Sequence, residues 1–177
     1  MGEGRTSCHH AARGQLPFRA VNRRGTPTYD PALQRHHLLP RQLLGRRCFG
    51  AFFRALGHER IGFHDFRRNG LLLPAREEAV ERLALPLHRG PHHDYNAMVI
   101  ERVGRIEGHW SRRCRSEPTR AAELALARLA GLQNSLRLKL LDERTPLRLN
   151  RKDPPGADKD FTHLDAMAET LWSATAA

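Results

Sequence analysis

Apolar residues recur at helical spacing in several parts of the chain. Leucine and phenylalanine form a broad stripe over Gln42–Leu56, and Gly57 follows as a stop. The same spacing occurs over Asn96–Ile106 and, for longest, over residues 119–141. Ala75–Leu83, with three glutamates, has the pattern of a further short helix. The pattern therefore predicts a mostly helical protein, in which the longest helix packs over the core or forms a dimer contact.

Strand-like patterns are short and fall in the first half of the chain. Ile61–Phe66 alternates apolar and polar residues and predicts one strand, and Leu71–Leu73 predicts a second, buried strand. Between them, Asn69-Gly70 is the dipeptide most typical of a turn. Gln34–Pro40 is expected to be extended or turn-like. Strands and helices together predict an α+β fold.

Composition divides the chain into three expected parts. Residues 1–30 mix Gly, Arg, Pro and Ser/Thr without apolar periodicity, which is typical of a flexible basic arm. Residues 31–117 carry the short strands and helices and are expected to form the core. Residues 118–177 are expected to form a helical extension, with a linker rich in Pro, Asp, Lys and Gly at Arg151–Asp160 and a last amphipathic segment at Phe161–Trp172.

Charge points to a polyanionic partner. The chain of 177 residues carries 30 basic and 19 acidic residues, a formal charge of +11, and 27 of the basic residues are arginine. Arginine forks bind phosphate oxygens well, so nucleic acid is the favoured partner, although a GC-rich genome also raises arginine content. Arg112, Arg113 and Arg115 form a basic cluster after the helix expected over Asn96–Ile106.

Location and redox state follow from what the sequence lacks. No apolar run approaches the roughly 20 residues that span a bilayer, and the N-terminus does not resemble a signal peptide, so we expect a cytoplasmic protein. Three cysteines without CxxC spacing argue against a disulfide scaffold.

Histidine is placed in a way that suits metal-assisted chemistry. His88 and His92 lie four residues apart, on one face of a helix or on one side of the turn entering it, a spacing that can hold one divalent metal. His36 and His37 are adjacent, so in an extended chain their side chains point to opposite sides. One can face a metal while the other faces a substrate water. Neutral imidazole binds borderline metals and titrates near working pH, so hydrolysis of a phosphodiester could use both functions.

Taken together, these motifs resemble those of a known protein family. The sequence HHLLP, then an Asn-Gly before LLLP, then LPLHRGPHHDY followed by a helix, resembles the AHH branch of the HNH/endonuclease VII (ββα-metal, His-Me finger) nucleases. The resemblance covers roughly Leu33–Ile106. It implies a β-hairpin followed by a helix around one divalent ion, and hence a mostly helical α+β domain around a ββα-metal core.

The resemblance also implies roles for individual residues. His36, His88 and His92 would be the metal ligands, and His37 the general base. Asn69 would keep the His37 ring in its working orientation through the loop. The phosphate would be bound by Arg89, Arg67 and Arg68.

Two departures from the family pattern bear on these roles. Arg35 stands where the family name has alanine. His93 stands where proline is expected after the last motif histidine, and it is therefore an alternative ligand to His92.

The expected activity is that of a metal-dependent endonuclease cleaving DNA with little sequence specificity, because no segment resembles a groove-reading recognition helix. The metal would be Zn, Mg, Mn or Ni; three imidazoles suit the softer ions better than Mg.

Similar domains form the tips of bacterial toxins. In that case the protein would be delivered into a target cell, and an acidic immunity protein is expected as a partner. The alternatives are a zinc-stabilised nucleic-acid-binding module without catalysis, and an RNA nuclease or other phosphodiesterase or hydrolase on the same scaffold. Oligomeric state stays open.

Overall fold

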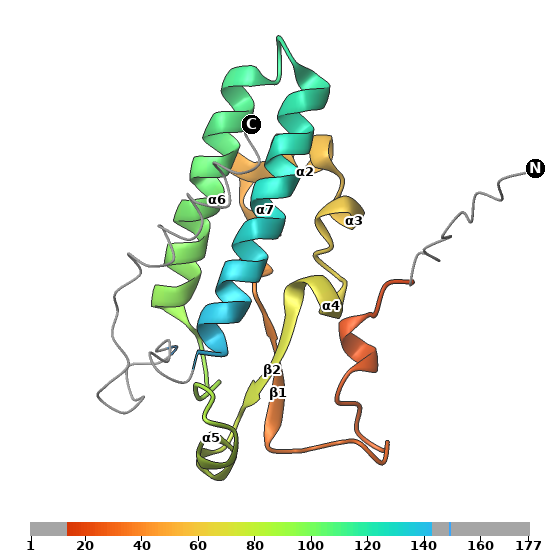
Figure 1. Cartoon of the computed structure of the whole chain (residues 1–177), viewed down its shortest axis with the longest axis vertical. Coiled ribbons are helices and arrows are strands. Elements are labelled where there is room, and N and C mark those ends of the chain that lie inside the picture. Colours follow the sequence, from red (N-terminus) through yellow and green to blue (C-terminus); the bar gives the residue numbers. More distant parts are fainter. Residues whose placement is uncertain (1–13, 143–148, 150–177) are drawn as a thin grey trace, which may run out of the picture.

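Figure 1 shows two long helices that form a hairpin at one end of the molecule and a small sheet at the other. This computed structural model describes residues 14–142 and residue 149. In chain order the elements are η1 (Phe18–Ala20), β1 (Leu33–His37), α1 (Gln42–Gly45), η2 (Arg47–Phe49), α2 (Gly50–Leu56), α3 (His58–Ile61), α4 (Phe66–Asn69), β2 (Gly70–Pro74), α5 (Glu77–Leu83), α6 (His93–Arg113) and α7 (Pro118–Leu140). The predicted α+β, mostly helical fold is confirmed.

The core lies where α6, α7 and α2 meet. Val99 and Val103 of α6, Leu132 and Leu136 of α7, and Phe52 of α2 are fully or almost fully buried. Burying a side chain of this size contributes roughly 1.5–3 kcal/mol relative to leaving it in water. The predicted helix over residues 119–141 is confirmed as α7, and its apolar stripe is part of this core.

The sheet consists of β1 and β2, which pair antiparallel with His36 opposite Leu71 and His37 opposite Gly70. The family resemblance implied a β-hairpin, but residues 38–69 separate β1 from β2 and contain α1, η2 and α2–α4. The two strands are therefore brought together by tertiary packing instead of a short turn.

The strand predicted over Ile61–Phe66 is wrong. Ile61 ends α3, Gly62 follows with a φ of +78°, and the Asp65 side chain caps the start of α4 by accepting a hydrogen bond from the Arg67 backbone N–H at 3.0 Å. Ile61 and Phe63 are both buried because they point into the core from this turn. Over so few residues, a turn with two inward side chains gives the same alternation as a strand.

Asn69-Gly70 is not a hairpin turn either. Asn69 ends α4, and Gly70 begins β2 with an extended φ of −119°. Glycine is needed at position 70 for a different reason: a Cβ there would lie 2.2 Å from a ring carbon of Phe66. The dipeptide marks a close approach between α4 and the sheet.

The other predicted elements need smaller corrections. The stripe over Gln42–Leu56 is broken into three short helices, because Arg46 is extended with a ψ of +118°. The helix predicted over Asn96–Ile106 is α6, which begins earlier, at His93, and runs on to Arg113. The short helix expected over Ala75–Leu83 is α5.

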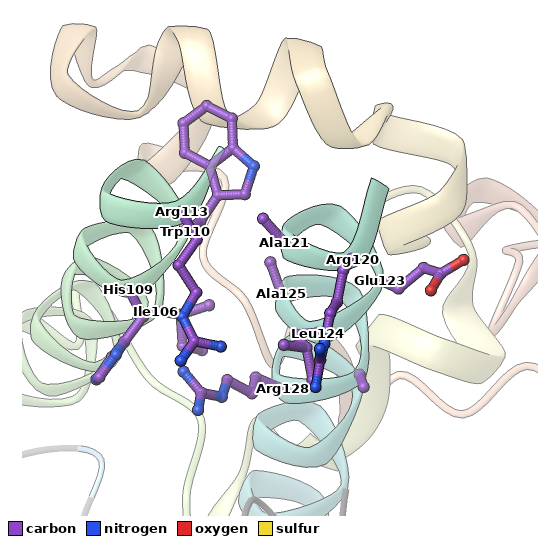
Figure 2. A pocket seen from close by; sticks show the side chains of 11 residues that line it. Ile106, His109, Trp110, Arg113, Arg120, Ala121, Glu123, Leu124, Ala125 and Arg128 are labelled. Atoms are coloured by element: carbon purple, nitrogen blue, oxygen red, sulfur yellow. The ribbon is translucent and has the colours of Figure 1, made fainter. Parts of the chain in front are cut away.

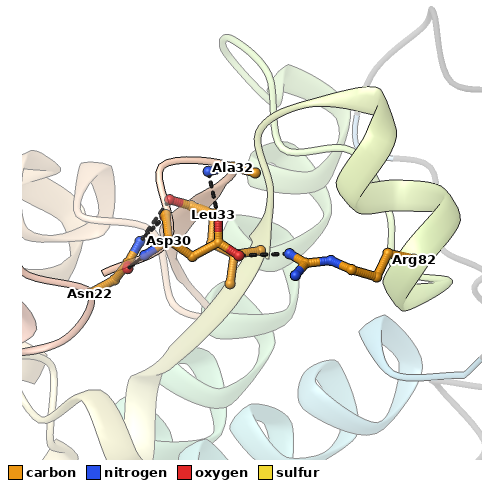
Figure 3. Close-up of polar contacts among 5 residues, drawn as sticks. All are labelled: Asn22, Asp30, Ala32, Leu33 and Arg82. Carbon is orange, nitrogen blue, oxygen red and sulfur yellow. Dashed lines mark hydrogen bonds and ion pairs between the residues drawn. The ribbon is translucent and has the colours of Figure 1, made fainter. Parts of the chain in front are cut away.

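From residue 14 onward, the N-terminal segment contacts the core, although a flexible arm was expected. The Asn22 side chain donates to the carbonyl oxygens of Asp30 and Leu33, and Asp30 pairs with Arg82 of α5 at 2.6 Å (Figure 3). The Arg82 hydrogen bond, helped by the Ala32 backbone N–H, lowers the pKa of Asp30. These contacts hold the entry to β1. The division of the chain near residues 30 and 117 stays a prediction; most of the last part, with the linker and the segment Phe161–Trp172, lies outside the described residues.

Candidate metal centre and active site

Three histidines converge between the sheet and the start of α6. One ring nitrogen from each of His36, His88 and His92 lies within 4.8 Å of the others. Their ring centroids are 5.0 Å apart for His36 and His88, 5.5 Å for His36 and His92, and 4.5 Å for His88 and His92. Such a group could hold one divalent metal ion.

Local backbone structure brings these three rings together. His36 lies on β1, next to β2. His88 lies in the segment that follows α5, where its backbone N–H donates to the carbonyl oxygen of Pro74 at 2.6 Å. Gly90 then adopts a φ of +73°, which glycine accepts without strain, and His92 forms the N-cap of α6. The HxxxH spacing therefore acts at the turn entering a helix, one of the two arrangements that the sequence allowed.

His93 takes no part in this cluster. It is the first residue of α6 and is exposed, whereas His92 is buried and belongs to the group of three.

The surroundings of His36 fit a metal ligand. Its side chain is 3% exposed, and its Nε2 atom has no hydrogen-bond partner among the described residues. Burial, followed by the nearby His88 and His92, lowers the pKa of His36 well below its usual value, so the ring is neutral at neutral pH. A buried neutral imidazole whose nitrogen has no partner is costly, and a cation bound at this point would satisfy it.

Tyr95 supports the site without facing solvent. Its ring contacts His36 with centroids 4.9 Å apart, and its hydroxyl donates to the carbonyl oxygen of Leu38 at 2.8 Å. Burial raises the pKa of Tyr95, which keeps the phenol protonated. In the structure it packs against His36 and ties α6 to the end of β1.

Gln34 is a site residue that sequence reasoning missed. The Nδ1 atom of His88 donates to the Oε1 atom of Gln34 at 3.0 Å, which leaves Nε2 of His88 with its lone pair. Hydrogen bonds of this kind orient histidine ligands toward metals. Gln34 precedes His36 by two residues, so both lie on one face of β1; that spacing is the signal that could have identified it.

His37 lies on the opposite face of β1, as the adjacent pair predicted. Its ring stacks on Phe18 with centroids 3.8 Å apart and planes 3° from parallel, and Phe18 in turn contacts the Phe66 ring edge-on. Burial lowers the pKa of His37 to about 4, helped by the positive charge of Arg41. The ring is therefore neutral at pH 7 and able to accept a proton. Phe18 was missed because nothing in a mixed N-terminal segment links it to a histidine nineteen residues later.

Asn69 is completely buried, and its amide holds the loop after His37 instead of bonding the His37 ring. Its Oδ1 accepts from the Leu39 backbone N–H at 2.7 Å, and its Nδ2 donates to the carbonyl oxygens of Leu39 and Phe63 at 3.2 Å each. Gln133 of α7 adds a bond to the same Oδ1 at 3.3 Å. Asn69 thus fixes where β1 ends.

The three arginines expected to bind the phosphate each contact a different part of the chain. Arg89 is exposed and 3.5 Å from Glu77. Arg67 and Arg68 donate to the carbonyl oxygens of Gly14 and Arg60, respectively. Two other cationic side chains lie close enough to His37 to depress its pKa, namely Arg41 and Arg35.

Comparison with known proteins agrees with this geometry. Residues 17–136 match the AHH family, described as a nuclease family of the HNH/ENDO VII superfamily with conserved AHH. The match covers more than half of the chain, and the chain belongs to this family; Arg35 replaces the alanine of its signature. No curated protein and no solved structure matches the chain. None of the helices in residues 14–142 has the length and apolar character needed to cross a bilayer.

Proposed function

We propose that this protein is a metal-dependent endonuclease that hydrolyses phosphodiester bonds, with DNA as substrate and little sequence specificity. The observation that carries the proposal is the pairing of two histidine environments on one short strand. His36 joins a cluster of three imidazoles, and His37, one residue later, is neutral and faces the other way. The nuclease family of the chain supports the same chemistry.

Each histidine has a defined task in this proposal. A divalent ion held by His36, His88 and His92 would stabilise the charge that develops on the phosphate and the leaving oxygen. His37 accepts a proton from the attacking water, because burial and nearby arginines keep its ring neutral. Phe18 holds the plane of the His37 ring, and Asn69 fixes the loop that follows it.

Substrate binding rests on charge. The excess of arginine supplies contacts to the phosphate backbone, with Arg89, Arg67 and Arg68 as the first candidates and Arg41 beside His37 as a further one. Contacts of this kind carry no base information, so we expect little sequence preference. Three imidazole ligands favour Zn, Ni or Mn over Mg.

In the cell, this activity suits a toxin-type effector restrained by an acidic immunity protein, because a nonspecific nuclease with a charge of +11 needs an inhibitor of opposite charge. Expression should then arrest growth, and His37→Ala should relieve the arrest. Growth unaffected by the active protein would argue against a toxin.

The test is plasmid cleavage by chelator-stripped protein, given Mg, Mn, Ni, Zn or no metal, alongside calorimetric metal binding. Wild type should nick and linearise the plasmid only with metal. His37→Ala should bind the metal with unchanged affinity and lose cleavage by about 100- to 10,000-fold. His93→Ala is the matched control: an exposed histidine beside the cluster that should affect neither measurement.

Other outcomes would redirect the proposal. If wild type binds the plasmid but cuts it with none of the ions, a non-catalytic binding module replaces the nuclease. If it cuts a matched RNA and spares DNA, the chemistry stands and the substrate changes.

A further inference from the structure

A groove separate from the histidine site opens between α6 and α7, near the turn that joins them (Figure 2). Its volume is about 730 Å³. Arginine side chains from both helices line it, Arg113 from α6 and Arg120 and Arg128 from α7, together with His109 of α6 and Glu123 of α7.

Small side chains explain why α6 and α7 do not fill the space between them at this end. Along the face of α7 that packs on α6, Leu129 and Leu136 fill the interface toward the sheet. Toward the turn, the corresponding positions are Ala121 and Ala125, which line the groove. Alanine cannot span the distance that leucine fills, so the helix pair stays open at this end.

The arrangement of charge in the groove favours an anion. Figure 2 shows Arg113 and Arg128 reaching from opposite helices toward each other across the groove. Glu123 also lines the groove, and Arg120 is 3.6 Å from Glu117. No carboxylate in residues 14–142 forms an ion pair with Arg113. Two guanidinium groups that converge from different helices can each make a charge-assisted contact to a phosphate placed between them.

We propose that this groove binds the phosphate backbone of the polynucleotide at a distance from the cleavage site; this inference rests on the proposed nuclease function. His109 follows His93 by sixteen positions along α6, which places the groove about 24 Å from the metal centre. At 3.4 Å per base pair, that is about seven base pairs. A duplex longer than this can contact the groove and the metal centre together, whereas a very short one contacts only one of them at a time.

The experiment measures binding without cleavage. Anisotropy titrations in chelator, over a range of salt concentrations, use a duplex DNA of about 30 base pairs, an RNA duplex of the same sequence, and a hairpin of about five base pairs, lengths chosen to exceed or fall short of that spacing. Wild type is compared with R113Q/R128Q and with R54Q/R105Q. The last variant removes the same charge from exposed arginines that do not line the groove.

The groove variant should bind the long duplexes about tenfold more weakly, and its slope of log affinity against log salt should be shallower by about 1.8, the value for two lost phosphate contacts. The control variant should match wild type in slope, and the short hairpin should show a smaller change than the long duplexes, because it can bind at the metal centre instead of the groove. Equal behaviour of the groove and control variants on the long duplexes would overturn the inference. Arg113→Gln alone, at an exposed position, should show about half the slope change and serves if the double variant is poorly folded.

The result is separable from that of the plasmid assay. If the groove variant behaves as expected but wild type never cuts, the binding site stands and the nuclease proposal fails. If the protein cuts plasmid but the groove and control variants bind alike, only the groove fails. The DNA and RNA duplexes identify which backbone the groove accepts.

Discussion

The two faces of β1 hold chemically similar residues in different surroundings. On one face, Gln34 and His36 join two histidines from outside the strand, and one ring nitrogen from each of the three histidines lies within 4.8 Å of the others. On the other face, His37 stacks on an aromatic ring near arginine side chains. Because side chains alternate along a strand, a step of one residue separates a metal-ligand environment from a proton-acceptor environment. The strand therefore determines which way each histidine points, and the residues packed against each face determine what that histidine can do.

The largest difference between the two faces should appear when the effects of His36→Ala and His37→Ala on metal affinity and cleavage are compared. His36→Ala deletes a ligand from the buried cluster, so metal affinity should fall by more than 100-fold and cleavage should be lost with it. In His37→Ala, cleavage should be lost while metal affinity stays within about threefold of wild type, since that ring lies on the other face. Calorimetry and plasmid cleavage on both variants check this, and equal loss of metal binding in the two would contradict the separation of the faces.

Asn69→Ala should disturb the end of the strand that both faces share. It removes the buried bonds to Leu39 and Phe63 and leaves backbone groups unsatisfied, so the free energy of unfolding should fall by about 3 kcal/mol. Urea denaturation measures this. Ser111→Ala, at an exposed helical position, is a control that should change stability by less than about 0.5 kcal/mol; a similar small change for Asn69→Ala would show that the loop does not depend on the amide.

Gln34→Ala should weaken the metal face alone. Without the acceptor for Nδ1, His88 loses its fixed orientation, and metal affinity should fall about tenfold, with the pH dependence of binding shifted because the tautomer is no longer set. Gln34→Glu keeps an acceptor and should restore affinity. Unchanged affinity in the alanine variant would mean that the cluster itself orients His88.

Phe18→Ala should weaken the other face alone. Removing the stacked ring lets His37 adopt other orientations, so kcat should fall about tenfold, the effect of a partly misplaced base, without a change in metal affinity. Phe18→Tyr keeps the stacking surface and should restore kcat. A fall in metal affinity or in KM alone would assign Phe18 a different role.

Acid should produce a graded effect on the stability of the metal-free protein. Burial lowers the pKa of both His37 and His88 to about 4, against about 6.5 in an unfolded chain. Between these pH values the unfolded chain binds more protons than the folded protein. The contribution of the two histidines to the free energy of unfolding is therefore fully present above pH 6.5 and declines as the pH falls toward 4. Denaturation at several pH values tests the sign, and His88→Gln should flatten the decline. Stability that rises on acidification would contradict the lowered pKa values.

Much of the site was predictable from local sequence. The HH pair on an extended segment, the HxxxH spacing before a helix and the long amphipathic helix each depend on residues near one another in the chain, and the structure has all three. The strand expected over Ile61–Phe66 failed because two buried side chains on a turn mimic alternation over so short a length. The predicted turn at Asn69-Gly70 was wrong because glycine is needed at position 70 to make room for the Phe66 ring. The dipeptide by itself does not reveal this contact.

By itself, the sequence determined which chemistry was available: four histidines with metal and base spacing, an excess of arginine, and helices from periodicity alone. These features are local, because they depend on alternation, on 3.6-residue repetition and on side-chain type. Only the tertiary structure decided the partners: Gln34 against His88, Phe18 against His37, Asn69 against the Leu39 backbone, and the arginines that meet across the groove. Such contacts join residues that are distant in the chain or on separate elements, and their geometry depends on how the whole core packs.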